Sequence, residues 1–242
     1  MKKYTIFSFF IFVFILSKTN AQDDILSKNY LSIGSNKAGI CFGNSKIYNG
    51  IRFNLIDRNV KQINFFNFNI LKAEALESNG VSLCLGVNYD FCNSGVSIAV
   101  FGNTGDKRNG IAGSGFFTNI SKMNGVAFAG LGLMGDTLNG ILLSTFAISN
   151  WASDSLIEQI NGIAFALIGI SAQKINGVTI AAINGSSQHY GLSIGVYNST
   201  EKLKGMQIGL INYVGNNPRG LKWLPFINMN FSKKNKIIPV PE

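Results

Sequence analysis

The sequence is poor in the residues from which most active sites, metal sites and disulfide frameworks are built. Its 242 residues include one histidine, three cysteines and four prolines, and only 14% are charged. A single histidine offers no zinc-ligand spacing, and Asp90, Asp106 and Asp136 lack the dense acidic spacing of a calcium loop. An odd number of cysteines cannot pair completely, although a bond between Cys84 and Cys92 remains open. We therefore expect no metal, no cofactor and no disulfide framework.

Long hydrophobic runs are also missing, except at the N-terminus. Lys2 and Lys3 precede an apolar stretch from Ile6 to Leu16, and Ala21 follows as a small residue suited to cleavage. A basic start, an apolar stretch and a small-residue cleavage site are typical of a secretory signal peptide. The apolar stretch is too short to span a membrane comfortably. We predict that residues 1–21 are a signal peptide and that the protein is exported.

Glycine, by contrast, is abundant, and much of it recurs at a regular spacing. Spaced glycines begin a short phrase whose clearest copy is Gly205–Asn212, with the sequence GMQIGLIN. From Gly80 onward the steps between copies are 15, 15, 15, 15, 22, 15, 14 and 14 residues. Asn precedes the glycine in most copies, and weaker copies start at Gly50 and Phe65. Such a period is the signature of a repeat architecture.

Within each copy, large apolar residues alternate with small or uncharged ones. If the repeat glycine is position 0, positions 1, 3 and 5 are mostly large, as in Met206, Ile208 and Leu210. Positions 2 and 4 are small or uncharged, as in Gln207 and Gly209. Successive side chains of a strand point to opposite faces, so this alternation indicates a β-strand, and Asn-Gly indicates a turn. We predict a single all-β repeat domain of about 12–14 strands over residues 22–231.

The remaining segments depart from the repeat. The one longer step holds an insertion within residues 150–160, which we place in a loop. Residues 70–77 have some helical character. Residues 232–242 contain prolines and lysines, and we expect them to form a disordered basic tail.

Charge is low and spread along the chain. After residue 21 there are 18 basic and 12 acidic residues, a net charge of +6, and within the strand patterns only Arg52 and Lys222 stand out. A nucleic-acid binder would concentrate its basic residues beside stacking aromatics, so we expect no nucleic-acid partner. Basic turns beside apolar strands fit anionic lipid head groups, and outer-membrane lipid is the expected partner.

The repeat phrase and the end of the chain together resemble a family of bacterial surface-repeat proteins. The phrase recurs every 14 or 15 residues. Its eight positions are Gly, a hydrophobic residue, Gln or Ser, Ile, Gly, a hydrophobic residue, any residue and Asn. The closing stretch Trp223–Phe231 has the sequence WLPFINMNF. The likeness covers residues 79–231 well and residues 30–78 weakly. It implies export to the envelope of a double-membraned bacterium and no known chemistry.

Two architectures fit a strand repeat of this length. An antiparallel up-and-down β-barrel in the outer membrane is favoured by uncharged large residues suited to lipid, and by a last strand in which apolar residues alternate with Asn228 and Asn230. Trp151 and Trp223 could lie at its membrane interfaces or pack as ordinary core residues. The alternative is a β-solenoid or β-roll, favoured by the one-strand period and by Pro225, which suits an open edge. We expect the barrel and keep the solenoid as the alternative.

Catalysis is not expected. His189 with Ser186, Ser187 and the upstream Asp154 could be imagined as a hydrolase triad, but His189 falls at a turn between repeats, where a polar residue is expected anyway. We assign no catalytic, cofactor-binding or metal-binding residue. The expected function is that of a non-enzymatic envelope protein, a structural barrel or passive pore. The alternative is a soluble surface-exposed solenoid adhesin or scaffold, and a lesser one is a lipid-modifying barrel enzyme.

Overall fold

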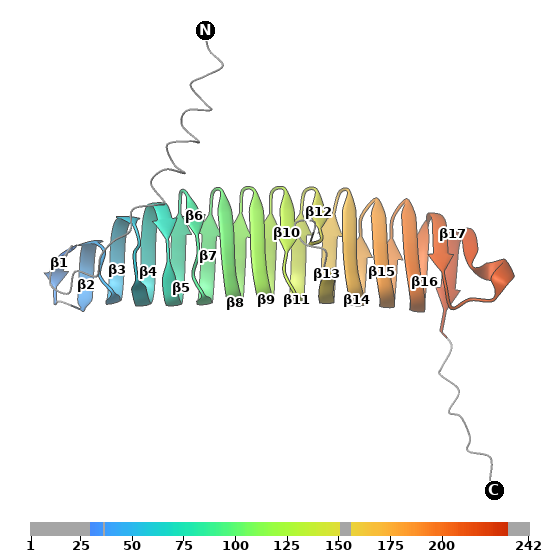
Figure 1. The fold of residues 1–242 in the computed structure, drawn as a ribbon, viewed down its shortest axis with the longest axis horizontal. Coiled ribbons are helices and arrows are strands. Elements are labelled where there is room, and N and C mark those ends of the chain that lie inside the picture. Colours follow the sequence, from blue (N-terminus) through green and yellow to red (C-terminus); the bar gives the residue numbers. More distant parts are fainter. Residues whose placement is uncertain (1–29, 36, 151–155, 232–242) are drawn as a thin grey trace, which may run out of the picture.

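A computed structural model describes residues 30–35, 37–150 and 156–231, and these residues form one long β-solenoid (Figure 1). It has about 11 stacked coils at a period of roughly 15 residues, and strands make up 79% of it. The all-β prediction is therefore confirmed. The predicted signal peptide and the predicted basic tail lie outside the described residues.

The strands follow one another along the rod in chain order (Figure 1). They are β1 (Tyr30–Gly34), β2 (Ala38–Gly43), β3 (Ile47–Ile56), β4 (Val60–Ala73), β5 (Ala75–Cys84), β6 (Val87–Asn88), β7 (Cys92–Ala99), β8 (Gly102–Ser114), β9 (Phe117–Ala129), β10 (Gly132–Met134), β11 (Thr137–Ser144), β12 (Ala147–Ile148), β13 (Ile157–Ala166), β14 (Gly169–Ile180), β15 (Ile183–Ile194), β16 (Tyr197–Val214) and β17 (Trp223–Asn230). Among the described residues one 3₁₀ turn, η2 (Arg219–Leu221), precedes the last strand.

Neighbouring coils pair in parallel, with each repeat glycine beside the next. Gly110 pairs with Gly125, and Gly125 pairs with Gly140. Gly140 pairs with Gly162 in the same register, so the longer step is absorbed outside the ladder. An up-and-down barrel needs antiparallel neighbours throughout, and here antiparallel pairs occur only between β1 and β2 and between β16 and β17 among the described strands. The barrel prediction is wrong, and the solenoid alternative is confirmed.

The repeat glycine bends a strand instead of closing a hairpin, which corrects the interpretation of Asn-Gly. Strand β9 runs through Gly125, whose φ is 130°. That conformation is accessible to glycine and costly for other residues. A Cβ atom on Gly125 would also lie 2.1 Å from the carbonyl oxygen of Gly110 in the previous coil. The coils therefore approach so closely at this corner that only glycine fits without strain.

The alternation of large and small residues along each strand also has an unexpected orientation, with the small residues facing inward. Small residues at position 2, such as Ala127 and Ala164, are buried inside the coil, whereas large residues at positions 1 and 3 point outward. Ile208, a large apolar residue at position 3, is part-exposed, whereas the polar Gln207 beside it is 1% exposed. A coil of roughly 15 residues encloses a narrow space, and small side chains fill it at normal packing density.

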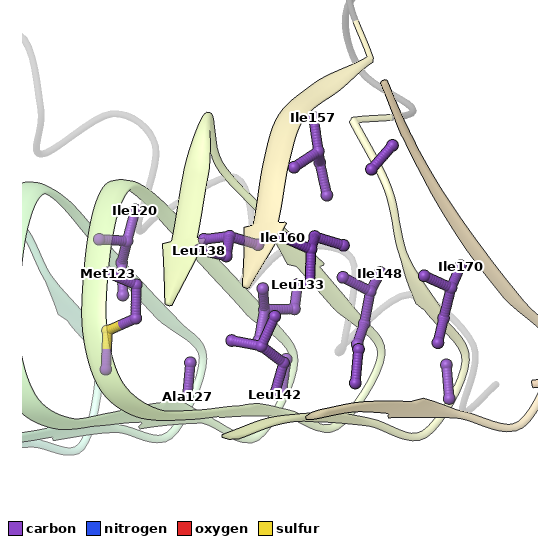
Figure 2. Packing of buried hydrophobic residues seen from close by; sticks show 14 of the residues in the cluster. Ile120, Met123, Ala127, Leu133, Leu138, Leu142, Ile148, Ile157, Ile160 and Ile170 are labelled. Carbon is purple, nitrogen blue, oxygen red and sulfur yellow. The ribbon is translucent and has the colours of Figure 1, made fainter. Parts of the chain in front are cut away.

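The middle of the interior forms the main hydrophobic core (Figure 2). Larger residues from other sides of the coil, among them Met123, Leu138 and Ile160, meet the small residues there. The core extends from Ala112 to Ala181. On either side of it the buried residues are largely polar.

The structure also tests two smaller predictions from the sequence. Residues 70–77 belong to β4 and β5 and have no helical turn. Cys84 and Cys92 are not bonded to each other, and the Cys84 thiol instead donates a hydrogen bond to the carbonyl oxygen of Val87. Within the insertion, residues 151–155 lie outside the described residues, and β13 begins at Ile157.

The adjacent pair Leu142 and Leu143 tests which face of the strand is core. Leu142 is fully buried, whereas Leu143 is 41% exposed. We expect Leu142→Ala to lower the free energy of unfolding by about 2–5 kcal/mol, because it leaves a cavity. Leu143→Ala, the matched control, should cost less than about 1 kcal/mol. Denaturant unfolding of both variants measures this, and equal losses would contradict the assignment of faces.

Phe65 occupies the position of a repeat glycine and adopts a φ of 93°. Its ring is 67% exposed, so little buried area is lost when it is removed. A non-glycine residue in such a conformation costs about 1–3 kcal/mol. We expect Phe65→Gly to raise the free energy of unfolding by about 1 kcal/mol, after the entropy cost of glycine. A melting temperature below that of the parent protein would contradict this expectation.

Candidate docking surface

One outward face of the rod is apolar along its length, and we call it the apolar face. It consists of positions 1, 3 and 5 of every coil, and no charged residue occupies any of these positions. Leu55, Leu167 and Leu210, from opposite ends of the chain, are 53%, 57% and 60% exposed. These large side chains are exposed because successive residues of a strand point to opposite faces, and the residues at positions 2 and 4 occupy the interior.

The two end strands extend the apolar face. In β1, Ile33 lies beside Ile40, and in β17, Met229 and Ile227 lie beside Met206 and Ile208. Both strands carry exposed apolar side chains. The face therefore continues without interruption from β1 to β17.

Its size sets the apolar face apart from ordinary surface. Coils spaced by about 4.8 Å and strands of five residues give roughly 50 Å by 16 Å, or about 800 Å². The largest apolar patch on a monomeric protein is usually about 300–600 Å², and larger ones mark interaction sites. All-parallel sheets, moreover, are found almost exclusively with both faces covered. The face therefore fits a docking surface.

A ladder of asparagines borders one side of the apolar face. These residues stand at position −1, and each side-chain amide donates to the amide oxygen of the previous coil: Asn124 to Asn109 at 2.9 Å, Asn139 to Asn124 at 2.8 Å, Asn161 to Asn139 at 2.5 Å and Asn176 to Asn161 at 2.6 Å. The other border is apolar and partly aromatic, with the rings of Phe101 and Phe116 stacked at 5.7 Å. The apolar face thus has one polar border and one apolar border.

Charged residues are also buried inside the rod, near its N-terminal end. Arg52 and Asp57 form an ion pair at 2.7 Å, and both side chains are fully buried. Arg108 lies 3.8 Å from Asp90 and donates a hydrogen bond of 3.0 Å to Asn103. Burial raises the pKa of the Asp90 carboxyl to about 6, although the charge of Arg108 opposes the rise. These groups are enclosed by the coils, so we assign them a structural role.

The imagined triad does not form a site. His189 lies inside the rod, 1% exposed, and burial lowers the pKa of its imidazole. The hydroxyl of Ser186 is hydrogen-bonded to that of Thr200 in the next coil, Ser187 is exposed on the outside, and Asp154 lies outside the described residues. A triad needs a nucleophile and an orienting acid around the histidine, and Nε2 of His189 has no hydrogen-bond partner among the described residues.

The other residues considered from the sequence are likewise scattered. Asp90 is buried in the interior, whereas Asp106 and Asp136 lie on the outside of separate coils. No group of three or more His, Cys, Asp or Glu side chains among the described residues is placed to hold a metal ion. Trp223 is 56% exposed and packs on the ring of Tyr213 at 4.7 Å, while Trp151 lies outside the described residues.

Comparison with known proteins adds no family. No family model, curated protein or solved structure matches the chain. The resemblance to surface-repeat proteins therefore stays a prediction. None of the helical turns in the described part of the chain is long and apolar enough to cross a membrane.

Sequence reasoning found the residues of the apolar face but misjudged what they contact. The absence of charge at positions 1, 3 and 5 was attributed to lipid around a barrel or to a solenoid core. The size of most residues at positions 2 and 4 could have indicated this, because a space lined largely by small side chains is narrow, although Arg52, Leu142 and Gln207 also occupy position 2. The signal was therefore present in the small residues.

The buried Asp90 gives a pH-dependent test of the interior. Because its pKa is raised when folded, the native state binds a proton more tightly than the unfolded chain between about pH 4 and pH 6. The contribution of Asp90 to stability is present at low pH and is lost as the pH rises through this window, by up to about 3 kcal/mol. We expect Asp90→Asn to remove this loss, so that thermal unfolding curves of parent and variant differ in their pH dependence. Asp106→Asn, on the outside, should keep the parent profile, and an Asp90→Asn profile parallel to the parent would contradict the assignment.

Proposed function

We propose that the protein is a non-enzymatic surface scaffold of the cell envelope, a β-solenoid rod that acts by docking through its apolar face. The observation that carries the proposal is the apolar face itself, uncharged from β1 to β17 and about 800 Å² in area. A rod whose coils all present the same columns of side chains offers a long, flat and rigid surface. Such a surface suits assembly better than the enclosure of a small substrate.

The expected passive pore is not supported, because the rod has no open lumen. The interior positions are filled, as shown by Leu142, Ile160 and Ala164, each of which is fully buried. Because the fold is not a barrel, a lipid-modifying barrel enzyme is not supported either. That interpretation rested on His189, which is enclosed in the rod and whose Nε2 has no hydrogen-bond partner among the described residues.

Export and surface location belong to the same proposal. They rest on the signal peptide predicted for residues 1–21 and on the resemblance of the repeat to bacterial surface proteins. Expression in a double-membraned bacterium tests both. The recovered protein should begin near Gln22, and it should be cleaved by protease added to intact cells.

Charges placed on the apolar face should detach the protein from the envelope. Phe165 and Leu167 are 38% and 57% exposed, so Phe165→Lys with Leu167→Lys should fold. Each lysine buried without a partner on docking costs more than the roughly 1.4 kcal/mol that corresponds to a factor of ten. We expect the cell-associated fraction of the double variant to fall at least about tenfold.

The matched control places two lysines outside the apolar face. Gln173 and Ser187 are exposed at position −4 of neighbouring coils, and Gln173→Lys with Ser187→Lys adds the same charge. Immunoblots of cells and medium compare the two variants, and circular dichroism verifies that both are folded. If the two double variants stay on the cell equally well, the apolar face is not the docking surface.

A further inference from the structure

We propose that the partner of the apolar face is a second copy of this chain, packed face to face in an antiparallel two-fold dimer. The inference rests on the proposed docking role of the apolar face and names its occupant; retention on the cell then depends on the dimer, so a face variant that stays monomeric should also leave the cell. Four observations support it: the area of the face, the regular spacing of its rows of side chains, the flat surface at its centre, and the different chemistry of its two borders.

The area suits a stable protein interface. A typical specific interface buries about 800 Å² on each partner, and the apolar face offers about the same area. The interface would have an apolar core and a polar rim, because uncharged side chains fill the face and Asn109, Asn124 and Asn139 run along one border. This is the usual anatomy of a protein–protein contact.

The spacing of the rows makes the apolar face complementary to itself. Outward residues of neighbouring coils lie in register, as Ile141 beside Ile163 and Leu143 beside Phe165. A second copy has the same spacing, so ridges on one rod meet grooves on the other along the whole length. The rod is straight (Figure 1), and two straight sheets can remain in contact at the usual sheet separation of about 10 Å.

The centre of the apolar face is its flattest part. The coils that start at Gly110 and Gly125 are central, because the equivalent positions Gly39, Gly50, Phe65, Gly80 and Gly95 precede them and Gly140, Gly162, Gly177, Gly191 and Gly205 follow them. Gly113 has no side chain there, and the ring of Phe128 lies over it, since a Cβ atom on Gly113 would meet that ring at 2.2 Å. A two-fold axis between these coils would bring the two Phe128 rings together over a surface without projections.

The borders decide the direction of the partner. In an antiparallel dimer the asparagine ladder of one rod faces the ladder of its partner, where amide groups can donate and accept. In a parallel dimer the ladder would face the apolar border with Phe101 and Phe116, and amides would be buried against apolar side chains at a cost. The antiparallel arrangement is therefore the one that the borders favour.

The surroundings of the apolar face favour a protein partner over a lipid surface. The charged residues nearest to the asparagine border are of both signs, among them Asp106, Lys107, Lys122, Glu158 and Lys174. A peripheral protein on an anionic bilayer usually presents a row of basic residues beside its apolar surface. Mixed charges give no such attraction, and they suit the solvent-exposed outside of a dimer.

Sedimentation of the protein as recovered from expressing cells tests the dimer. We expect twice the chain mass at micromolar concentration, and no binding to vesicles of phosphatidylcholine with phosphatidylglycerol. Leu143→Lys, next to the centre and 41% exposed in the single chain, should raise the dissociation constant at least about tenfold. Gln173→Lys, outside the apolar face, should leave it unchanged.

Cysteine pairs test the direction. In the antiparallel dimer the coil of Leu143 faces the coil of Ile98 of the second copy, whereas in a parallel dimer Leu143 would face itself. With the native cysteines replaced by serine, a short bismaleimide, which adds one thiol at each end and spans the gap between the sheets, should cross-link two chains of Ile98→Cys with Leu143→Cys, and it should not cross-link Leu143→Cys alone. Cross-linking by the single variant would overturn the antiparallel arrangement.

The remaining outcomes separate this inference from the proposed function. A monomer that binds the vesicles would overturn the dimer while leaving the apolar face a docking surface for lipid. A monomer that binds no vesicles, and whose face variants stay on the cell, would overturn the dimer and the docking role together. A dimer that Leu143→Lys does not weaken would place the interface elsewhere.

Discussion

The close stacking of one repeat glycine on the next is the constraint on which the rest of the structure depends. At Gly125 the chain turns a corner with a φ of 130°, and a Cβ atom there would lie 2.1 Å from the carbonyl oxygen of Gly110. Because every coil turns at the same place, backbone groups of successive coils meet in register and form a parallel ladder. The coil can then be no wider than its roughly 15 residues allow, and the narrow interior selects small side chains for positions 2 and 4. Large apolar residues are thereby left outside, and the docking surface is a consequence of the corner.

The interior also explains why the rod tolerates buried polar groups. A stack of coils carries columns of equivalent positions, so a buried polar side chain can meet a like neighbour one coil away; His189, which lies between Ile175 and Leu203, is an exception. Asn184, Asn198 and Asn212 donate and accept in one such column at 2.8 Å, and each amide also reaches a backbone carbonyl. Amides paired in this way avoid the cost of unpartnered burial. Arg52 and Asp57 also satisfy each other, as a buried pair of opposite charges. On the outside of the rod, asparagines form a similar column along the border of the apolar face.

Much of the architecture could be predicted from the sequence, because the period and the alternation are local properties. The all-β class and the repeat organisation followed from the spacing of Gly110, Gly125 and Gly140. Strand direction could not be predicted in the same way, since Asn-Gly supports both a hairpin and a bend within a strand, and only the pairing of distant residues distinguishes them. The face that Ile208 occupies depended on that direction. Once the coils are parallel, the width of the coil decides whether the large or the small residues face inward. That width is a property of the whole fold, and no single repeat encodes it.

The same reasoning connects the fold to a partner. A closed barrel would have hidden its uncharged residues in lipid, and a solenoid with large residues inside would have had a polar exterior. Neither arrangement applies to this rod, because its interior is already filled by other side chains, among them Leu138, Leu142 and Ile160. Charge is absent from positions 1, 3 and 5 in every coil, although nothing inside the single chain requires it to be absent there. The constraint on these positions must then come from outside the chain, and a second rod with the same row spacing satisfies it over the whole length of the face.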